Sequence, residues 1–125
     1  MKKVILDTNF LMSIYQLKID IFEEINNTLL ENIEFYIIDK TKDELEKLIN
    51  TSKLSDSQAA KFALKVLEKK PIKVIKTTKN KLVDDLILEQ NGYIVATVDK
   101  ELKQKLKKKK IQILTIKQKK YIILD

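Results

Sequence analysis

Four acidic residues occupy corresponding places in the sequence, each a little beyond a short apolar run. Asp7 directly follows the run at residues 4–6, and Asp99 directly follows the run at residues 93–98. Glu44 and Asp84 fall in the first turns of the helices expected after two other apolar runs. In an open parallel sheet every strand delivers its carboxyl end to the same edge. We therefore expect the four carboxylates to converge on one rim of a sheet.

Helix phase indicates which acid of each neighbouring pair points inward. Glu44 stands four residues before Leu48, on the edge of the apolar stripe of its helix, whereas Asp43 faces away from that stripe. Asp84 likewise lies on the apolar side of its helix, with the outward Asp85 as the alternative. The helix dipole also favours early acids, which is another explanation for Glu44 and Asp84. That explanation does not cover acids that end buried strands, as Asp7 and Asp99 are expected to do.

The composition excludes most other kinds of active site. The 125 residues include no His and no Cys, so imidazole bases, thiolate nucleophiles and zinc sites built on these residues are excluded. A single Gly excludes a P-loop and a Gly-rich dinucleotide turn. Carboxylate oxygens suit hard cations, above all Mg²⁺ or Mn²⁺. One or two such ions at the rim would be able to act on a phosphodiester.

The expected elements form one α/β domain over residues 1–125. Short apolar runs alternate with longer helical patterns, which is typical of a parallel sheet between two layers of helices, a three-layer sandwich. The runs that predict strands are residues 4–6, 35–38, 72–75, 93–98 and 111–114, the last as an edge strand, with one more short strand at 121–124. The patterns that predict helices cover residues 10–17, 20–31, 41–50, 56–69, 80–91 and 99–109.

The charge is basic and unevenly distributed. Residues 1–60 carry 7 Lys and 11 acids, whereas residues 61–125 carry 18 Lys and 7 acids. Such a basic half favours a polyanionic partner, with nucleic acid first. The densest run follows Asp99 and predicts contacts with RNA phosphates, or alternatively only a solvated helix face. Its lysines are Lys103, Lys105, Lys107, Lys108, Lys109 and Lys110.

Four segments of the chain together resemble the PIN-domain nucleases. They are the stretches at residues 6–12 (LDTNFLM), 43–48 (DELEKL), 83–88 (VDDLIL) and 93–102 (YIVATVDKEL), in the order and spacing of that family. The resemblance covers essentially the whole chain and selects the same four acids, Asp7, Glu44, Asp84 and Asp99, as metal-binding catalytic residues. It implies a parallel sheet of strand order 3-2-1-4-5 and endonucleolytic cleavage of single-stranded RNA. Members that process ribosomal RNA in archaea and eukaryotes look most similar.

Five other residues are candidates for supporting roles. The resemblance gives Thr8 and Asn9 the task of supporting the first acid. Asn9 and Thr97 are hypothesised to hydrogen-bond the carboxylates and fix their orientation, although turn or cap chemistry would explain both equally well. Asp85 and Glu101 are candidate additional ligands, and the sequence leaves their participation open.

Two other functions remain open beside a nuclease of ribosomal RNA processing. One is a VapC-type toxin that is silenced by an antitoxin, and the other is a catalytically silent PIN-like module that binds RNA or protein. A homodimer is expected only by analogy with relatives. A cytoplasmic protein without a membrane-spanning helix is expected, since no long uncharged apolar stretch is present and an acid appears as early as Asp7.

Overall fold

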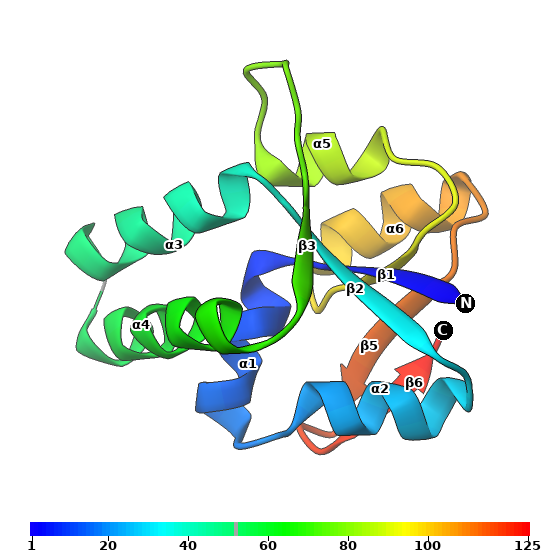
Figure 1. Ribbon diagram of the computed structural model, residues 1–125, viewed down its shortest axis with the longest axis horizontal. Coiled ribbons are helices and arrows are strands. Elements are labelled where there is room, and N and C mark those ends of the chain that lie inside the picture. The colour runs from blue at the N-terminus through cyan, green and yellow to red at the C-terminus, as the bar shows by residue number, and fades with distance from the viewer. Residues whose placement is uncertain (52) are drawn as a thin grey trace.

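The computed structural model describes residues 1–51 and 53–125, and its six strands form one sheet with β1 near the middle (Figure 1). The order across the sheet is β3-β2-β1-β4-β5-β6. The first five strands are parallel and β6 runs antiparallel to β5. The strands are β1 (Lys2–Leu6), β2 (Ile33–Ile38), β3 (Ile72–Ile75), β4 (Ile94–Ala96), β5 (Ile113–Lys117) and β6 (Tyr121–Leu124). The expected α/β class and the order 3-2-1-4-5 are confirmed.

Helices cover both faces of this sheet, which makes three layers (Figure 1). Helices α1 to α4 pack against one face, and α5 and α6 pack against the other. Their bounds are α1 (Thr8–Leu17), α2 (Ile21–Leu29), α3 (Lys40–Thr51), α4 (Leu54–Lys69), α5 (Val83–Leu88) and α6 (Lys100–Lys108).

Strand β1 shows why its sequence is apolar at consecutive positions. Val4 and Leu6 belong to the core beneath α1–α4, whereas Ile5 belongs to the core beneath α5 and α6. All three side chains are fully buried, because successive residues of a strand point to opposite faces and both faces are covered. A polar residue at the end of this strand therefore enters a crowded apolar environment.

Two predicted elements differ from the structure in a way that matters for the site. Helix α5 begins at Val83 rather than at residue 80, because Lys79 and Asn80 are held outside it by Lys40. The strand at residues 111–114 lies at 113–117 and is not an edge strand, since β6 pairs with its outer side. In the part of the chain that the structure describes, none of the helices combines the length and apolar character needed to span a membrane.

Candidate active site

Asp7 lies where β1 ends and α1 begins, and its side chain is only 3% exposed. Its backbone N–H donates to the carbonyl oxygen of Ala96 at 3.0 Å, which extends the pairing between β1 and β4 by one residue. Its carboxylate caps α1, with Oδ1 accepting the N–H of Thr8 at 2.9 Å. A buried acid at the end of a central strand is thus fixed by backbone on two sides.

Thr97 connects the ends of β1 and β4. Its hydroxyl donates to Oδ2 of Asp7 at 2.8 Å and accepts the backbone N–H of Asp99 at 3.1 Å. Its own N–H donates to the carbonyl oxygen of Leu114 at 3.0 Å, so it is also tied to β5. Thr97 is fully buried, and its hydroxyl has both a donor and an acceptor partner. Both oxygens of Asp7 accept hydrogen bonds, a pattern that suits an ionised carboxylate.

Asp99 is the N-cap residue of α6, as Asp7 is of α1, but its carboxylate reaches the third residue of the helix rather than the first. Its Oδ1 accepts the N–H of Leu102 at 2.9 Å, which makes it the N-cap residue of that helix. One oxygen is committed to the cap, and the side chain is half-buried. Capping alone explains an acid at this place, so its second role depends on its neighbours.

The four acids are near enough to act on one another electrostatically. The pKa of Asp7 is raised to about 7, first by burial and then by the charges of Asp84 and Glu44, against the opposing hydrogen bonds from Thr97 and Thr8. The pKa of Asp84 is also raised, first by burial and then by the charges of Asp99, Glu44 and Asp85. Mutual repulsion of this kind favours the binding of a cation.

The acids are spread along the rim and do not form a closed cage. Among residues 1–51 and 53–125, no three acidic side chains lie close enough together to make a ready-made metal site. Glu44 and Asp84 stand on separate helices, in the early turns of α3 and α5, and both side chains are half-buried. The available oxygens are therefore dispersed around Asp7.

Two buried hydroxyls accompany these acids and lack a hydrogen-bond partner among the described residues. Thr8 follows Asp7 and is 1% exposed, and Thr41 lies three residues before Glu44 and is fully buried. An unpaired buried hydroxyl costs free energy, about 1–3 kcal/mol. Thr41 was not among the residues predicted from the sequence. The spacing of three from Glu44 at the start of a helix was the available signal, because residues i and i+3 share one helix face.

The other predicted supporting residues are placed less favourably. The Asn9 side chain is exposed, and the structure gives it no hydrogen bond within the described part of the chain. Glu101 is 83% exposed at its side chain and lies 3.8 Å from the ammonium group of Lys105. Asp85 is half-buried, and its charge contributes to the raised pKa of Asp84.

The lysine run follows α6 away from the acids. Helix α6 follows its N-cap residue Asp99 and rises about 1.5 Å per residue, so Lys110 lies about 15 Å from the rim. Lys107 pairs with Asp125 at 3.3 Å, and the ammonium group of Lys109 donates to the carbonyl oxygen of Leu88 at 2.8 Å. The hydroxyl of Thr115 accepts from Lys103 at 3.4 Å, and Lys108 is exposed. Of the run, the members on the first turns of the helix lie nearest the acids.

A mostly parallel sheet between helices, with acids at the carboxyl ends of its strands, defines an α/β protein with a carboxylate site at the switch in strand order. The family model described as "PIN like domain" matches residues 4–119 of this chain. The chain belongs to the PIN-like family, and the resemblance seen in its sequence is confirmed.

Individual relatives are similar over almost their whole length. The chain is 36% identical to Ribonuclease VapC4 of Methanocaldococcus jannaschii, with 97% of this chain and 95% of the relative covered. It is 33% identical to Ribonuclease VapC9 of Archaeoglobus fulgidus, with 97% and 87% covered. Among solved structures, the PIN domain endonuclease Utp24 superposes with a TM-score of 0.82 at 32% identity, with 98% of this chain and 90% of that chain covered.

Proposed function

We propose that this chain is an endoribonuclease that hydrolyses phosphodiester bonds of single-stranded RNA with one or two Mg²⁺ or Mn²⁺ ions. The observation that carries the proposal is the environment of Asp7. Its carboxylate is buried, accepts two hydrogen bonds, and has a pKa raised to about 7 by burial and by neighbouring acids. The similar proteins named as ribonucleases and as a PIN domain endonuclease support the same conclusion.

The residues at the rim fit a hard divalent ion. The donors are carboxylate oxygens together with the unpaired hydroxyls of Thr8 and Thr41, and the chain has no His or Cys. Mg²⁺ keeps several waters and is usually bound through one or two carboxylates, so a dispersed set of acids suits it. Asp7, Glu44, Asp84 and Asp99 would hold the ion directly or through water, as the family resemblance implies.

The residues of the chain itself contribute orientation and charge. A bound divalent ion would lower the pKa of a water molecule that it holds and would stabilise negative charge on the phosphate. Thr97 and the N–H of Thr8 fix both oxygens of Asp7, so this carboxylate presents its remaining lone pairs in a set direction. Asp99 is held next to Thr97 through its own N–H. The chain has no imidazole to serve as a general base.

One assay tests the activity. Purified protein is incubated with end-labelled single-stranded RNA and Mn²⁺ or Mg²⁺, beside a sample with EDTA, and cleavage is read on a denaturing gel. Asp7→Asn is expected to remove cleavage, and the exposed Asp43→Asn is the matched control that keeps it. Cleavage that survives EDTA or Asp7→Asn contradicts the proposal. Binding of RNA without any cleavage by the unaltered protein favours the silent module instead.

Within this activity we propose a role in ribosomal RNA processing, which is supported by the superposition with the PIN domain endonuclease Utp24. Mapping of cut positions on a ribosomal RNA precursor, compared with other structured RNAs of equal length, tests it. A preferred cut in the precursor is the expected result. Equal cutting of all RNAs contradicts this role and leaves the general ribonuclease activity in place.

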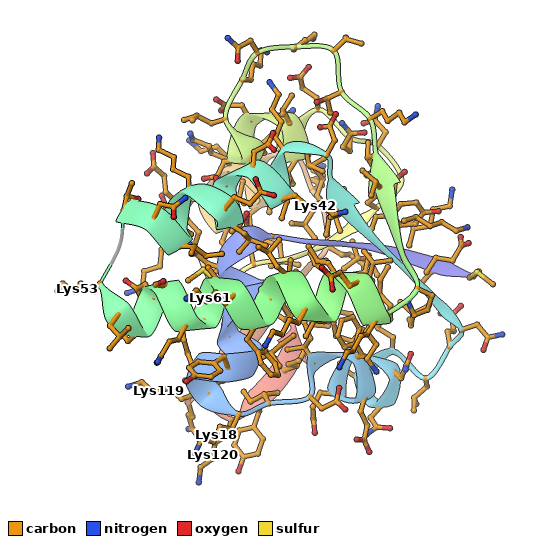
Figure 2. All side chains as sticks on the ribbon, turned by 60° about the vertical axis from the view of Figure 1, so that its left-hand side comes forward. Lys18, Lys42, Lys53, Lys61, Lys119 and Lys120 are labelled. Atoms are coloured by element: carbon orange, nitrogen blue, oxygen red, sulfur yellow. The ribbon has the colours of Figure 1, made fainter. Side chains whose placement is uncertain are left out.

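A toxin restrained by a protein antitoxin is the second candidate, and one surface favours it. A hollow of about 740 Å³ between α1 and α4 is lined by Ile14, Tyr15 and Phe62, whose two aromatic side chains are 41% and 39% exposed. Lys18, at the end of α1, also lines this hollow, and Figure 2 shows it below Lys61 on α4. An apolar groove beside lysines suits an acidic amphipathic segment.

Expression of the chain alone and together with the product of an adjacent small gene tests the toxin role. Growth arrest that the second product relieves is the expected result, and Phe62→Lys should prevent the relief while RNA cleavage continues. Absence of growth arrest contradicts this role. Light scattering of the purified chain tests the homodimer that analogy suggests.

A further inference from the structure

The segment between β3 and α5, residues 76–82, is a basic part of the chain at the edge of the sheet that carries the acids. It contains Lys76, Lys79 and Lys81 and no acid. It stands out from the body of the molecule beside α5 (Figure 1). Its last residue, Leu82, is the N-cap position of the helix that carries Asp84. Any chain of nucleotides that reaches Asp84 over the start of α5 passes this segment.

The segment is held to the ends of β2 and α3 although it projects. Asp39, at the end of β2, accepts the N–H of Thr77 at 2.8 Å and its hydroxyl at 2.7 Å. These hydrogen bonds hold the pKa of Asp39 below its ordinary value. The ammonium group of Lys40 donates to the carbonyl oxygen of Lys79 at 2.7 Å. A surface segment held at several points loses less conformational freedom on binding a ligand.

The acids that face the segment already have ion-pair or hydrogen-bond partners within it. Glu89, beyond the end of α5, pairs with Lys79 at 2.6 Å and with Lys81 at 3.1 Å, and Asp39 is satisfied by Thr77. Lys76 is exposed, and the structure gives it no ion pair within the described residues. The segment with its neighbours Lys40, Asp39 and Glu89 therefore keeps a surplus of positive charge. An RNA strand needs such a surplus next to a rim of acids that repels its phosphates.

A small polar hollow marks the place of contact. It measures about 240 Å³ and lies between the segment and the flank of α5. Its lining side chains offer ammonium, hydroxyl and amide donors, from Lys76, Thr78, Lys79 and Gln90, whereas the hydroxyl of Thr77 already donates to Asp39 and Glu89 is paired. Leu86, the lining residue on α5, lies on the side of that helix away from Asp84, about one helix diameter or ~10 Å from it. A phosphate bound here would thus flank the bond that is cut.

We infer that residues 76–82 bind a backbone phosphate of single-stranded RNA next to the bond positioned at the acids, with Lys76 and Lys79 as the contacts; this rests on the proposed function. The far end of the α6 lysine run is less suited to this task. Lys110 lines a different hollow, together with Met1 and Gly92, at the opposite edge of the sheet. Contacts there would lie well away from the reacting bond.

Binding of RNA to a variant that is expected not to cleave it tests the inference. The dissociation constant of a fluorescent single-stranded RNA for the Asp7→Asn protein is measured between 50 and about 300 mM KCl. Adding Lys76→Gln and Lys79→Gln is expected to weaken binding about tenfold and to reduce the salt slope by about 0.7 for each phosphate that a lysine no longer neutralises. Lys119→Gln with Lys120→Gln removes the same charge from a distant turn and is expected to change neither quantity.

Two further variants separate contact from loop stability. Glu89→Gln removes the ion pair of Lys79, and that of Lys81 as well, but keeps Lys76 and Lys79, and it is expected to strengthen RNA binding. Lys76→Gln alone breaks no ion pair among the described residues and is expected to give about half of that reduction in slope. Unchanged affinity in the Lys76 and Lys79 variants, in a protein that binds RNA, overturns the inference but not the ribonuclease proposal. If the lysine variants weaken RNA binding as expected but the unaltered protein never cleaves RNA, only the ribonuclease proposal is overturned. If the protein does not bind RNA at all, both proposals are overturned.

Discussion

The hydroxyl of Thr97 donates a hydrogen bond of 2.8 Å to Oδ2 of Asp7, across 90 positions of the sequence. The same hydroxyl accepts the N–H of Asp99, so one threonine orients an acid from β1 and the residue that caps α6. Since a hydroxyl has a single proton, donation to Asp7 leaves only its lone pairs for Asp99. The relative placement of these two acids therefore depends on a side chain that carries no charge.

Asp7→Asn is expected to stabilise the fold at pH 8 in EDTA while it removes RNA cleavage. The pKa of Asp7 is raised from 3.8 to about 7 in the folded state. The unfolded state therefore releases the proton first, and the folded protein loses up to about 4 kcal/mol as the pH rises from about 4 to about 7. Asn cannot ionise and escapes this loss. Urea unfolding at pH 4.5 and 8 measures it, and an equal pH dependence in both proteins would contradict the burial of an ionisable Asp7.

Thr97→Val is expected to move the pH profile of RNA cleavage to higher pH and to lower the maximal rate by about 10- to 100-fold. The hydrogen bond from Thr97 lowers the pKa of Asp7, so without it this pKa rises further. Thr97→Ser keeps the hydroxyl and should restore both the rate and the profile. A Val variant with the unaltered profile would show that Thr97 only fills space.

Divalent ions are expected to stabilise the protein through the rim. At a concentration 100-fold above the dissociation constant, Mn²⁺ should add about 2.7 kcal/mol to the free energy of unfolding. This corresponds to a rise in melting temperature of roughly 10 °C for a domain of this size. Thermal melts with and without EDTA measure the effect. Glu44→Gln and Asp84→Asn should reduce the rise, and Asp43→Asn should not; an equal rise in all variants would place the ion elsewhere.

Leu106→Ala is expected to cost about 2–5 kcal/mol of stability. Leu106 is fully buried and, with Leu102, is one of two buried side chains that α6 contributes to the core. The exposed Lys108→Ala is the control and should change stability by less than about 0.5 kcal/mol. Urea unfolding measures both. Equal stabilities would mean that α6 does not depend on these contacts.

The sheet, and the place of Asp7 and Asp99 at the ends of adjacent strands, were predictable because they depend on patterns of many residues. Continuous apolar runs indicate strands buried on both faces, and parallel topology then brings the ends of β1 and β4 together. Asp7 beside Thr97 follows from this pairing of adjacent strands. What the sequence does not contain is the distance between carboxylates on different helices, and the structure leaves these acids more dispersed than a cluster.

Turns and helix ends that lack the residues usually found at such places were not predictable. The turn between β5 and β6 has Gln118 and Lys119 at positive φ, and α6 ends with Lys110 at positive φ. Glycine or asparagine normally marks such positions, so nothing in these lysine-rich stretches signals a turn. The early part of the predicted helix 80–91 is a loop because of Lys40, a residue distant in sequence.

The position of β1 has a consequence for how this protein is made. Of the six strands, β1 is synthesised before the others, yet its pairing with β4 in the sheet (Figure 1) requires that residues 94–96 have also been made. Pairing over such a separation is slow to form and closes late. A nascent chain that stops short of Thr97 holds Asp7 without the hydroxyl that orients it. The rim is therefore assembled only after residues 94–99 have been synthesised and β4 has paired with β1.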